Sequence, residues 1–457
     1  MSKQLTVSRK GFIFDVNKCV GCHACVVACN IENSTEPGQN WRNVYTFNEN
    51  QHLLLPLFSH SLACNHCIEA PCLKSCPANA YSRDKKTGAV LLNKDKCMGC
   101  KYCTWACPYD TPKFNKLTST VEKCTFCNHR LEKNEIPACA NLCPTGALSF
   151  GEIPENTDET NQNIPGFTNK KINPSIKING MRKTNEKPEI DIFQVENYKI
   201  EDFNPFAELR ESKITIKKEW ILVLFTLLIA FLSGTFTAWV FGGKSINPAG
   251  FIIAGVAGML MSFLHLGKKQ RAYRAIFNLK TSWLSREIFF FSGFIALAFV
   301  FFFILPSWDW LIWPILGFGF STAISADMVY RVISKQLHSA SITLTALFLT
   351  SLLSGSILFS GIFMLFKFLL YIRRKIAFAG HKKPVGLIVS TIRICAGFFL
   401  PALIWIYWGF EPVQRYFIFA GIMAGEIIDR IEFYLEADVI TPKKQMLIHA
   451  EKKSGEI

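Results

Sequence analysis

The chain has 457 residues, of which 50% are hydrophobic, and it carries 17 cysteines and a formal net charge of +15. This length leaves room for two or three domains, and the apolar content exceeds that of an average soluble protein. The charge would suit a nucleic-acid-binding protein if it lay on one soluble face. Much of it lies in loops beside long apolar runs instead, so we expect no nucleic-acid partner.

Composition divides the chain into four parts. Residues 1–150 hold sixteen of the cysteines, residues 151–218 are rich in Asn, Lys, Glu and Pro, residues 219–435 carry long apolar runs, and residues 436–457 form a polar tail. We therefore expect a soluble metal-binding domain, a partly extended linker that wraps it, a helical membrane domain and a short C-terminal tail.

The first residues predict a short strand over residues 11–16. Residues 8–12 weakly resemble a twin-arginine export signal, but no apolar region of the required length follows before Asp15 and Lys18. We expect no export by a signal of the chain's own.

Sixteen cysteines form four groups of four at metal-ligand spacing. The groups are Cys19, Cys22, Cys25, Cys29; Cys64, Cys67, Cys72, Cys76; Cys97, Cys100, Cys103, Cys107; and Cys124, Cys127, Cys139, Cys143. The first and third groups have the C-x2-C-x2-C-x3-C run of bacterial ferredoxins, and three groups close with Cys-Pro. This pattern favours four 4Fe-4S clusters over disulfides.

Two other metal sites share parts of this pattern. Structural zinc also uses C-x2-C pairs, but it does not account for the Cys-Pro closures. Residues 19–23 satisfy the C-x-x-C-H motif of covalent haem c, although Cys25 and Cys29 at ferredoxin spacing favour the cluster.

The order of the groups predicts nested pairs. In a two-cluster ferredoxin the fourth cysteine of each run binds the other cluster. Residues 86–92 read as the turn and strand of the hairpin between the second and third groups, which would form one pair inside the first and fourth. The predicted ligand sets are Cys19, Cys22, Cys25 with Cys143; Cys29 with Cys124, Cys127, Cys139; Cys64, Cys67, Cys72 with Cys107; and Cys76 with Cys97, Cys100, Cys103.

Seven apolar runs follow, and most are near the ~20 residues that a bilayer span needs. They cover residues 220–241, 249–266, 288–305, 310–330, 340–372, 386–408 and 413–434. The run 340–372 is long for one span and short for two, with residues 354–356 as its one candidate turn. The predicted fold class is therefore an α+β ferredoxin-like domain followed by an all-α membrane domain of seven or eight helices.

Basic residues predict the orientation. Those on the side of the cysteine-rich domain are Arg210, Lys213, Lys217, Lys218, Lys268, Lys269, Arg271, Arg274, Lys280, Arg286, Arg331 and Lys335, whereas the opposite side receives Lys244. By the positive-inside rule, the cysteine-rich domain is cytoplasmic. A second basic set joins that side only if the run 340–372 crosses twice, which favours eight helices. This set is Arg373, Arg374, Lys375, Lys382, Lys383, Lys443, Lys444, Lys452 and Lys453.

Ionisable residues within the apolar runs are candidates for function. His265 ends the second run and is either an ordinary interfacial residue or a quinol-binding proton acceptor. Arg393, Glu426 and Arg430 are candidates for the same site, or they form structural pairs, such as Arg430 with Glu426 one turn away. We expect no haem, because His265 is the one histidine clearly within a run.

Two further residues have ordinary interpretations. Lys367 is expected to extend to the membrane interface, and Cys395 to fill the core.

These motifs resemble the dimethyl sulfoxide reductase family, as a fusion of its four-cluster iron-sulfur subunit with its quinol-oxidising membrane anchor. The first likeness rests on residues 22–25, 64–67, 102–109 and 139–147, and the second on residues 265–267, 274–275, 284–288 and 425–434. The resemblance implies menaquinol oxidation near His265 and a separate molybdopterin catalytic subunit. It also implies that the first and fourth groups face that subunit, and the second and third face the membrane.

We therefore expect an inner-membrane electron-transfer subunit of an oxidoreductase, with terminal catalysis on a partner chain in anaerobic respiration. The same parts would serve the reverse direction, from a donor to quinone. A quinone-coupled ion-translocating complex is the alternative of another class, although carboxylates are scarce in the first five apolar runs.

Overall fold

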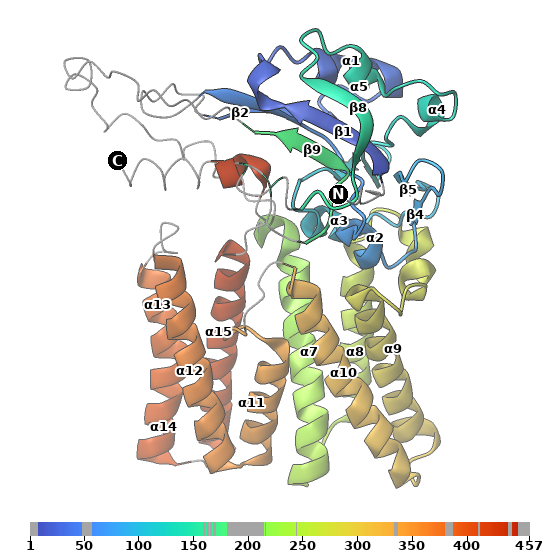
Figure 1. Ribbon diagram of the computed structural model, residues 1–457. Coiled ribbons are helices and arrows are strands. Elements are labelled where there is room, and N and C mark those ends of the chain that lie inside the picture. The colour runs from blue at the N-terminus through green and yellow to red at the C-terminus, as the bar shows by residue number, and fades with distance from the viewer. Residues whose placement is uncertain are drawn as a thin grey trace, which may run out of the picture. The chain divides into compact units, whose positions relative to one another are not determined.

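A computed structural model describes residues 8–47, 57–158, 161, 164, 167, 171–180, 214, 216–243, 245–332, 337–379, 387–409, 412–436 and 441–446. They belong to two compact units, Met1–Ser212 with Val439–Ile457, and Lys213–Asp438 (Figure 1). Several basic residues used to predict orientation lie outside the described side chains, namely Arg210, Lys213, Lys217, Lys218, Lys244, Lys335, Lys382, Lys383, Lys452 and Lys453.

A three-stranded sheet organises the first unit. Its central strand, β1 (Ser8–Asp15), pairs antiparallel with β8 (Leu148–Pro154) and parallel with β9 (Ile176–Asn179). The strand predicted over residues 11–16 is thereby confirmed. Parts of the predicted linker, within β8 and β9, complete this sheet.

Three antiparallel hairpins accompany the sheet. They are β2 (Asn43–Phe47) with β3 (Phe58–Leu62), β4 (Tyr81–Arg83) with β5 (Val90–Leu92), and β6 (Lys113–Asn115) with β7 (Thr120–Glu122). The β4–β5 pair confirms the hairpin predicted between the second and third cysteine groups. Its turn is built by Asp84, whose Oδ1 accepts hydrogen bonds from the backbone N–H groups of Lys86 and Thr87.

Short helices follow the cysteine loops. They are η1 (Val16–Lys18), α1 (Ala24–Asn33), α2 (Pro71–Ser75), α3 (Tyr102–Ala106), α4 (Asn128–Leu131) and α5 (Ala138–Asn141). Phe126 packs between Phe12, Phe150 and His66, with ring centroids 4.1–5.2 Å apart. This aromatic core joins the sheet to the cysteine loops.

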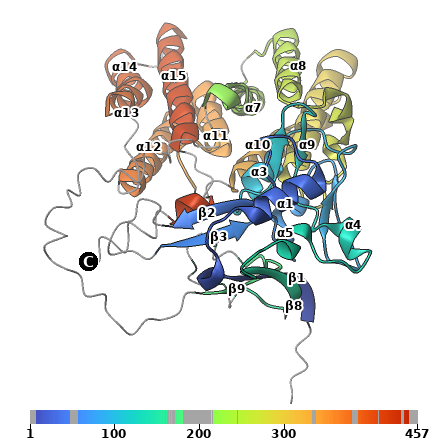
Figure 2. The ribbon, with the colours of Figure 1, turned by 90° about the horizontal axis from the view of Figure 1, so that it is seen from above.

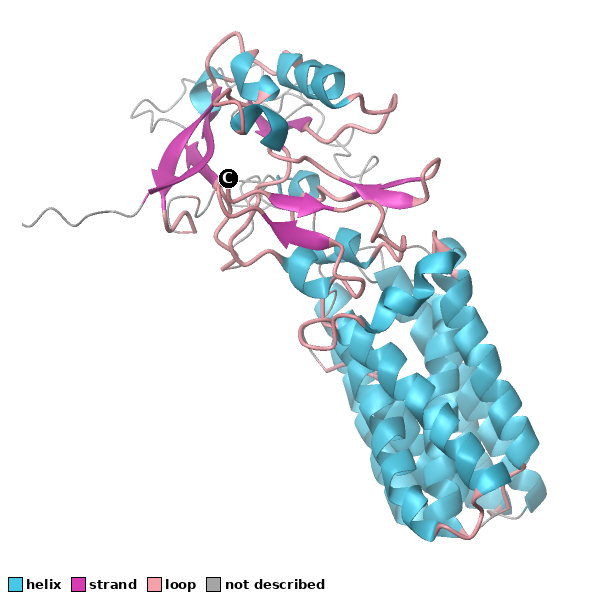
Figure 3. Cartoon of the chain, turned by 90° about the vertical axis from the view of Figure 1, so that its right-hand side faces the viewer, coloured by secondary structure: helices cyan, strands magenta, loops and turns pink. Residues whose placement is uncertain are grey.

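The second unit is helical wherever the structure describes regular elements (Figure 3). Its helices are α7 (Ile216–Gly242), α8 (Pro248–Leu264), η4 (Lys269–Ile276), α9 (Trp283–Phe299), η5 (Val300–Ile304), η6 (Asp309–Leu311), α10 (Ile312–Tyr330), α11 (Ile342–Ser354), α12 (Ile357–Ala379), α13 (Leu387–Ile394), η7 (Cys395–Phe399), α14 (Leu400–Trp408) and α15 (Pro412–Glu436). Within the described residues, four helical stretches are long and apolar enough to cross a membrane, and the bent pair α8–η4 makes a fifth.

The long apolar run 340–372 is divided between two helices. Gly355 ends α11 with a φ of +80°, a left-handed conformation that glycine adopts at little cost. α12 begins two residues later. The turn predicted over residues 354–356 is confirmed.

Two glycines let the last helices approach closely. A Cβ atom on Gly425 of α15 would lie 2.5 Å from the Cα of Gly397, which is in η7. Small residues at such crossings allow backbone contact between membrane helices. The crossing holds α15 against the segment that follows Arg393.

Candidate functional site

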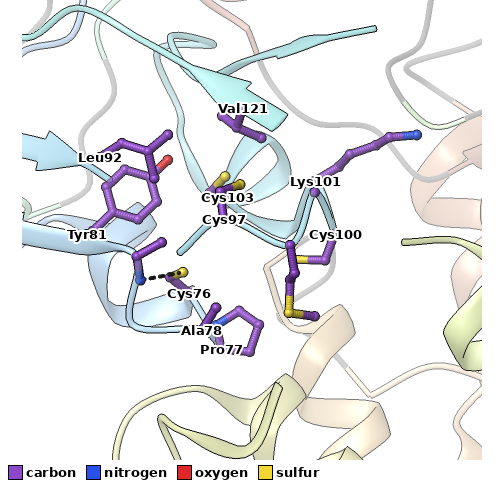
Figure 4. Close-up of a pocket in the computed structure, with 13 residues that line it drawn as sticks. Cys76, Pro77, Ala78, Tyr81, Leu92, Cys97, Cys100, Lys101, Cys103 and Val121 are labelled. Atoms are coloured by element: carbon purple, nitrogen blue, oxygen red, sulfur yellow. Dashed lines mark hydrogen bonds between the residues drawn. The ribbon is translucent and has the colours of Figure 1, made fainter. Parts of the chain in front are cut away.

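Four cysteines from two groups of the sequence line one hollow of the first unit. Cys97, Cys100 and Cys103 lie on and after the loop that leads into α3, whereas Cys76 ends α2. Figure 4 shows their sulfur atoms around the same hollow, among apolar side chains. The backbone N–H of Ala80 donates a hydrogen bond to Cys76 Sγ at 3.4 Å. The hollow therefore offers four sulfur donors, one of them already oriented by the backbone.

A second hollow has the same construction. Cys19, Cys22 and Cys25 from the first group line it together with Cys143 from the fourth. The backbone N–H of Leu148 donates to Cys143 Sγ at 3.3 Å. Sequence neighbours supply three sulfurs here, and a residue more than a hundred positions away supplies the fourth.

The remaining eight cysteines make up the two other predicted sets, and within each set cysteines lie in electrostatic range of one another. The sets are Cys64, Cys67, Cys72 with Cys107, and Cys29 with Cys124, Cys127, Cys139. In each set, cysteines of one group lie within electrostatic range of a cysteine from another group, although Cys29 and Cys124 are also within range of Cys25 and Cys64 of other sets. This placement supports the predicted exchange between the second and third groups and between the first and fourth.

The loops of the first and third groups share a backbone conformation. Gly21 and His23 have φ values of +68° and +61°, and the equivalent Gly99 and Lys101 have +72° and +60°. Left-handed residues on both sides of the second cysteine turn the chain sharply, so that three nearby sulfurs face one hollow. Non-glycine residues in this conformation are strained, and such strain is commonly retained at functional sites.

The donor chemistry and the geometry fit iron-sulfur clusters. All sixteen predicted ligands are sulfur atoms, the usual donors for such clusters. In the part of the chain that the structure describes, no three His, Cys, Asp or Glu side chains converge closely enough to hold one metal ion.

Burial makes several of these thiols hard to ionise without a bound metal, and Cys29 is an example. Burial raises the pKa of Cys29 to about 12, although the positive charge of Arg42 opposes the rise. Metal ligation requires the thiolate, so binding and proton release are coupled at such a site.

Arg42 was not singled out by the sequence, and it lies inside the first unit with 1% of its surface exposed. Its Nη1 donates to the carbonyl oxygen and to Oγ of Ser61, at 3.1 and 3.0 Å. Its guanidinium carbon is 4.7 Å from the centre of the Phe12 ring. Burial would lower the pKa of Arg42, but nearby cysteine thiolates raise it above its ordinary value.

His265 lies at the C-terminal end of α8 and is half-buried. The chain then bends by 109° into η4. The basic residues Lys268, Lys269 and Arg271 follow within six positions. His265 thus stands where an apolar helix meets a strongly basic connection.

A buried ionic network connects α12, α13 and α15. Lys367 Nζ lies 2.8 Å from Glu426 Oε2, and Arg393 Nη2 lies 3.4 Å from Glu426 Oε1 and 3.5 Å from Asp429 Oδ2. Arg374 Nη2 lies 2.7 Å from Asp429 Oδ1. Further members extend the network toward the end of α15: Lys375, Glu432 and Glu436.

Three expectations about these residues are wrong. The helical pair Arg430–Glu426 does not form, because cations from α12 and α13 occupy both oxygens of Glu426 while the Arg430 guanidinium carbon lies 5.9 Å from the Phe433 ring centre. Lys367 does not extend to an interface, because its carboxylate partner is inside the unit and the lysine is 0% exposed. Cys395 does not fill the core, since it lies exposed in η7.

The predicted quinol-site residues fall into two separate places. Arg393 and Glu426 meet in the ionic network, whereas His265 is on α8 (Figure 2). Both ribbon views place α8 beside α9, on the side of the bundle away from α12 and α13. The arrangement favours structural pairs over a shared quinol site for Arg393 and Glu426.

Two further acidic residues of the helical unit were given no role from the sequence. Glu287 on α9 is 3% exposed. Asp327 on α10 accepts hydrogen bonds from Ser341 Oγ and from the backbone N–H groups of Ile342 and Thr343, which fixes the start of α11. The available signals were the position of Asp327 as a single acid within the run 310–330 and the position of Glu287 directly before the run 288–305.

Comparison with known proteins matches both units. Residues 56–153 match a family model described as a 4Fe-4S dicluster domain, and residues 216–378 match one described as the DMSO reductase anchor subunit (DmsC).

Curated relatives match the first unit. The arsenate respiratory reductase iron-sulfur subunit ArrB of a Shewanella species is 32% identical over 34% of this chain and 87% of its own length. The iron-sulfur subunit of a putative dimethyl sulfoxide reductase from Halobacterium salinarum is 35% identical over 34% of this chain and 71% of its own. A tetrathionate reductase subunit of Salmonella typhimurium is 39% identical over 32% of this chain, which spans 58% of that protein's length.

Proposed function

This chain belongs to the dimethyl sulfoxide reductase family of iron-sulfur subunits, fused to an anchor of the same family, and from that premise we propose that it oxidises menaquinol and passes the electrons to a separate molybdopterin reductase subunit. The observation that carries the proposal is the placement of four cysteine sets, two of them around hollows, on the same chain as an anchor-type helical unit.

The proposed ligand sets are the four that exchange a fourth cysteine. They are Cys19, Cys22, Cys25, Cys143; Cys29, Cys124, Cys127, Cys139; Cys64, Cys67, Cys72, Cys107; and Cys76, Cys97, Cys100, Cys103. Bound 4Fe-4S clusters would accept and release one electron at a time. Backbone N–H···S bonds to Cys76, Cys124 and Cys143 orient one sulfur in each of three of these sets.

His265 is the proposed proton acceptor of the quinol site. Histidine is the side chain commonly used for proton transfer near neutral pH, which suits a group that takes a proton from a quinol hydroxyl while electrons leave toward the clusters. Its place at the end of an apolar helix, beside a basic connection, supports this role. We assign Arg393 and Glu426 a structural role, as an ion pair that holds helices of the bundle together. Arg430 stays a weaker candidate for the quinol site.

The anchor-type sequence and its apolar helices make the chain a membrane protein. We propose eight crossings of the inner membrane with the iron-sulfur domain in the cytoplasm. The division of the run 340–372 at Gly355 supports the count, and the distribution of Lys and Arg supports the orientation. The proposed domain boundaries are those predicted from the sequence: an iron-sulfur domain over residues 1–150, a linker over 151–218, a membrane domain over 219–435 and a C-terminal tail over 436–457.

The same parts would carry electrons in the reverse direction, from a donor to quinone. Ion translocation through the carboxylates of α15 is disfavoured, because Glu426, Asp429, Glu432 and Glu436 are each paired with a buried or half-buried cation. A nearby cation stabilises the ionised form of a carboxylate, so a paired carboxylate takes up a proton less readily and makes a poor proton relay.

The test uses anaerobic membranes that contain the full chain. His265→Ala should keep clusters that dithionite reduces, while their reduction by a menaquinol analogue slows by roughly 100-fold or more. His129→Ala, at the exposed residue paired with Glu32 in the first unit, is the matched control. Reduction of the His265→Ala clusters by the analogue at the wild-type rate would refute the role of His265.

A further inference from the structure

A buried cation, Arg42, lies among cysteines of two proposed clusters. Arg42 immediately precedes β2, and its Nη1 is held by Ser61. Ser61 Oγ in turn lies 3.1 Å from Cys25 Sγ. Arg42 is thereby connected through one hydroxyl to a ligand of the set that ends in Cys143.

The rest of the guanidinium is not satisfied by the protein. Arg42 Nε and Nη2 are buried and have no hydrogen-bond partner among the described residues. An unpartnered buried donor is costly, and native structures rarely leave one without a reason. Two N–H groups are therefore available to a group that the polypeptide does not supply.

The charge of Arg42 has no carboxylate partner in the described part of the chain. The negative groups that act on it are thiolates of two sets: Cys25 of one, and Cys29, Cys124 and Cys139 of the other. A buried charge needs compensation. Here the compensation comes from the proposed cluster ligands, so the burial of Arg42 makes physical sense when the sites are filled.

We propose that Arg42 is a positioning residue shared by the two clusters of the first and fourth cysteine groups, to which its free Nε–H and Nη2–H donate hydrogen bonds and whose reduction potentials its charge raises. The proposal rests on the proposed cluster ligands. When such a cluster gains one electron from its donor it gains one negative charge, and no bond is made or broken. The guanidinium keeps its proton and stabilises the reduced form more than the oxidised form, as charge and N–H···S bonds do at such centres.

The effect should be selective. The second group has other cationic neighbours, with Lys123 acting on Cys72 and Arg9 interacting with Cys67, whereas the cysteines that act most strongly on Arg42 all belong to the first and fourth groups. Loss of the Arg42 charge should therefore lower two potentials and leave the other two nearly unchanged.

The test is an anaerobic redox titration of the full chain, followed by electron paramagnetic resonance, for wild type, Arg42→Gln and Arg42→Lys. In Arg42→Gln, the reduction equilibrium of two clusters should fall at least tenfold, which is about 59 mV for a one-electron couple. Arg42→Lys, which keeps the charge, should restore most of that loss. Arg130→Gln is the matched control, because Arg130 is partly exposed and already paired with Glu32 and Glu135.

Unchanged potentials in Arg42→Gln, or an equal shift of all four, would overturn the proposal. If Arg42→Gln fails to assemble clusters, wild-type protein labelled with ¹⁵N-arginine decides the matter. Pulsed electron paramagnetic resonance of the reduced clusters should detect a coupling to arginine ¹⁵N that the Arg42→Lys variant lacks. Absence of this coupling in the wild-type protein would also overturn the proposal. Wild-type protein without iron signals would instead contradict the proposed function.

Discussion

At the scale of single residues, Lys367 shows how a charge is accommodated within an apolar helix bundle. Its Nζ donates to Glu426 Oε2 and to Thr345 Oγ1 at 2.8 Å, and to the carbonyl oxygen of Ser339 at 2.6 Å. Three acceptors satisfy the three ammonium hydrogens. The lysine therefore needs no water, although it lies within the apolar run 340–372.

Removal of one partner should be far more damaging than removal of both. Lys367→Met would leave Glu426 with the hydroxyl of Thr345 and the more distant cation Arg393, and loss of a buried pair's partner typically costs about 3–5 kcal/mol. The double variant Lys367→Met/Glu426→Gln should recover a large part of that loss. Thermal unfolding of the full chain in detergent measures both, with Lys269→Met at an exposed site as the control. Equal stability of Lys367→Met and wild type would contradict the account.

His60 is a second buried ionisable residue, this time in the first unit. It is 0% exposed, and neither ring nitrogen has a hydrogen-bond partner among the residues that the structure describes. The rings of Phe14, Phe58 and Phe167 surround it, with centroids 5.4–6.4 Å away. Burial lowers the pKa of His60 to about 4.

This histidine should make the first unit acid-sensitive. A group whose pKa is about 6.5 unfolded and about 4 folded binds its proton preferentially in the unfolded state, so stability is retained above pH 6.5 and falls between pH 6.5 and 4. At pH 5.5 the loss is about 1.4 kcal/mol relative to pH 8. His60→Phe should remove that component, which unfolding at both pH values measures. An unchanged difference between the two pH values in His60→Phe would show that His60 is not its source.

Residues with local partners could be predicted, and residues with distant partners could not. The cysteines are recognisable because three ligands of each set lie within a short stretch of chain. Lys367 was predicted to extend to an interface because its partner, Glu426, is 59 positions later. Arg42 gave no signal, since the cysteines around it come from several separate segments.

At the scale of elements, α11 and α12 explain why hydropathy alone does not settle the number of spans. α11 has 13 residues, about 20 Å of helix, which is shorter than the ~30 Å hydrocarbon core. α12 is long enough but carries Lys367 and several basic residues near its end. Both depart from the uniform apolar run of about 20 residues that a sequence search expects.

The pair can be tested through its topology. Alkaline phosphatase, which is active only outside the cytoplasm, can be fused after Thr281, Gly355 or Ala379. Two crossings by α11 and α12 predict inactive fusions at Thr281 and Ala379 and an active fusion at Gly355. Activity at Ala379 would mean that the run crosses once, and the proposed eight helices would then be wrong.

At the scale of the whole molecule, the sequence was sufficient for the two kinds of unit, because cysteine spacing and apolar run length are properties of composition. The sequence was insufficient to predict β9, the edge strand of the three-stranded sheet in the first unit. β9 lies in a segment that is rich in Asn and Lys and has no clear periodicity, and its place is determined by pairing with β1, more than 160 residues earlier. Long-range pairing of this kind leaves little trace in a single sequence.

The central claim is that one chain carries four clusters and delivers their electrons to a molybdenum enzyme. It is tested most directly by anaerobic purification from native membranes in mild detergent, with iron and molybdenum analysis and identification of the chains that co-purify. Four complete sets predict about sixteen iron atoms per chain, with a molybdopterin protein attached. A content of about eight iron atoms, or zinc in their place, would contradict the four clusters, and full iron with a molybdenum-free partner would contradict the proposed destination of the electrons.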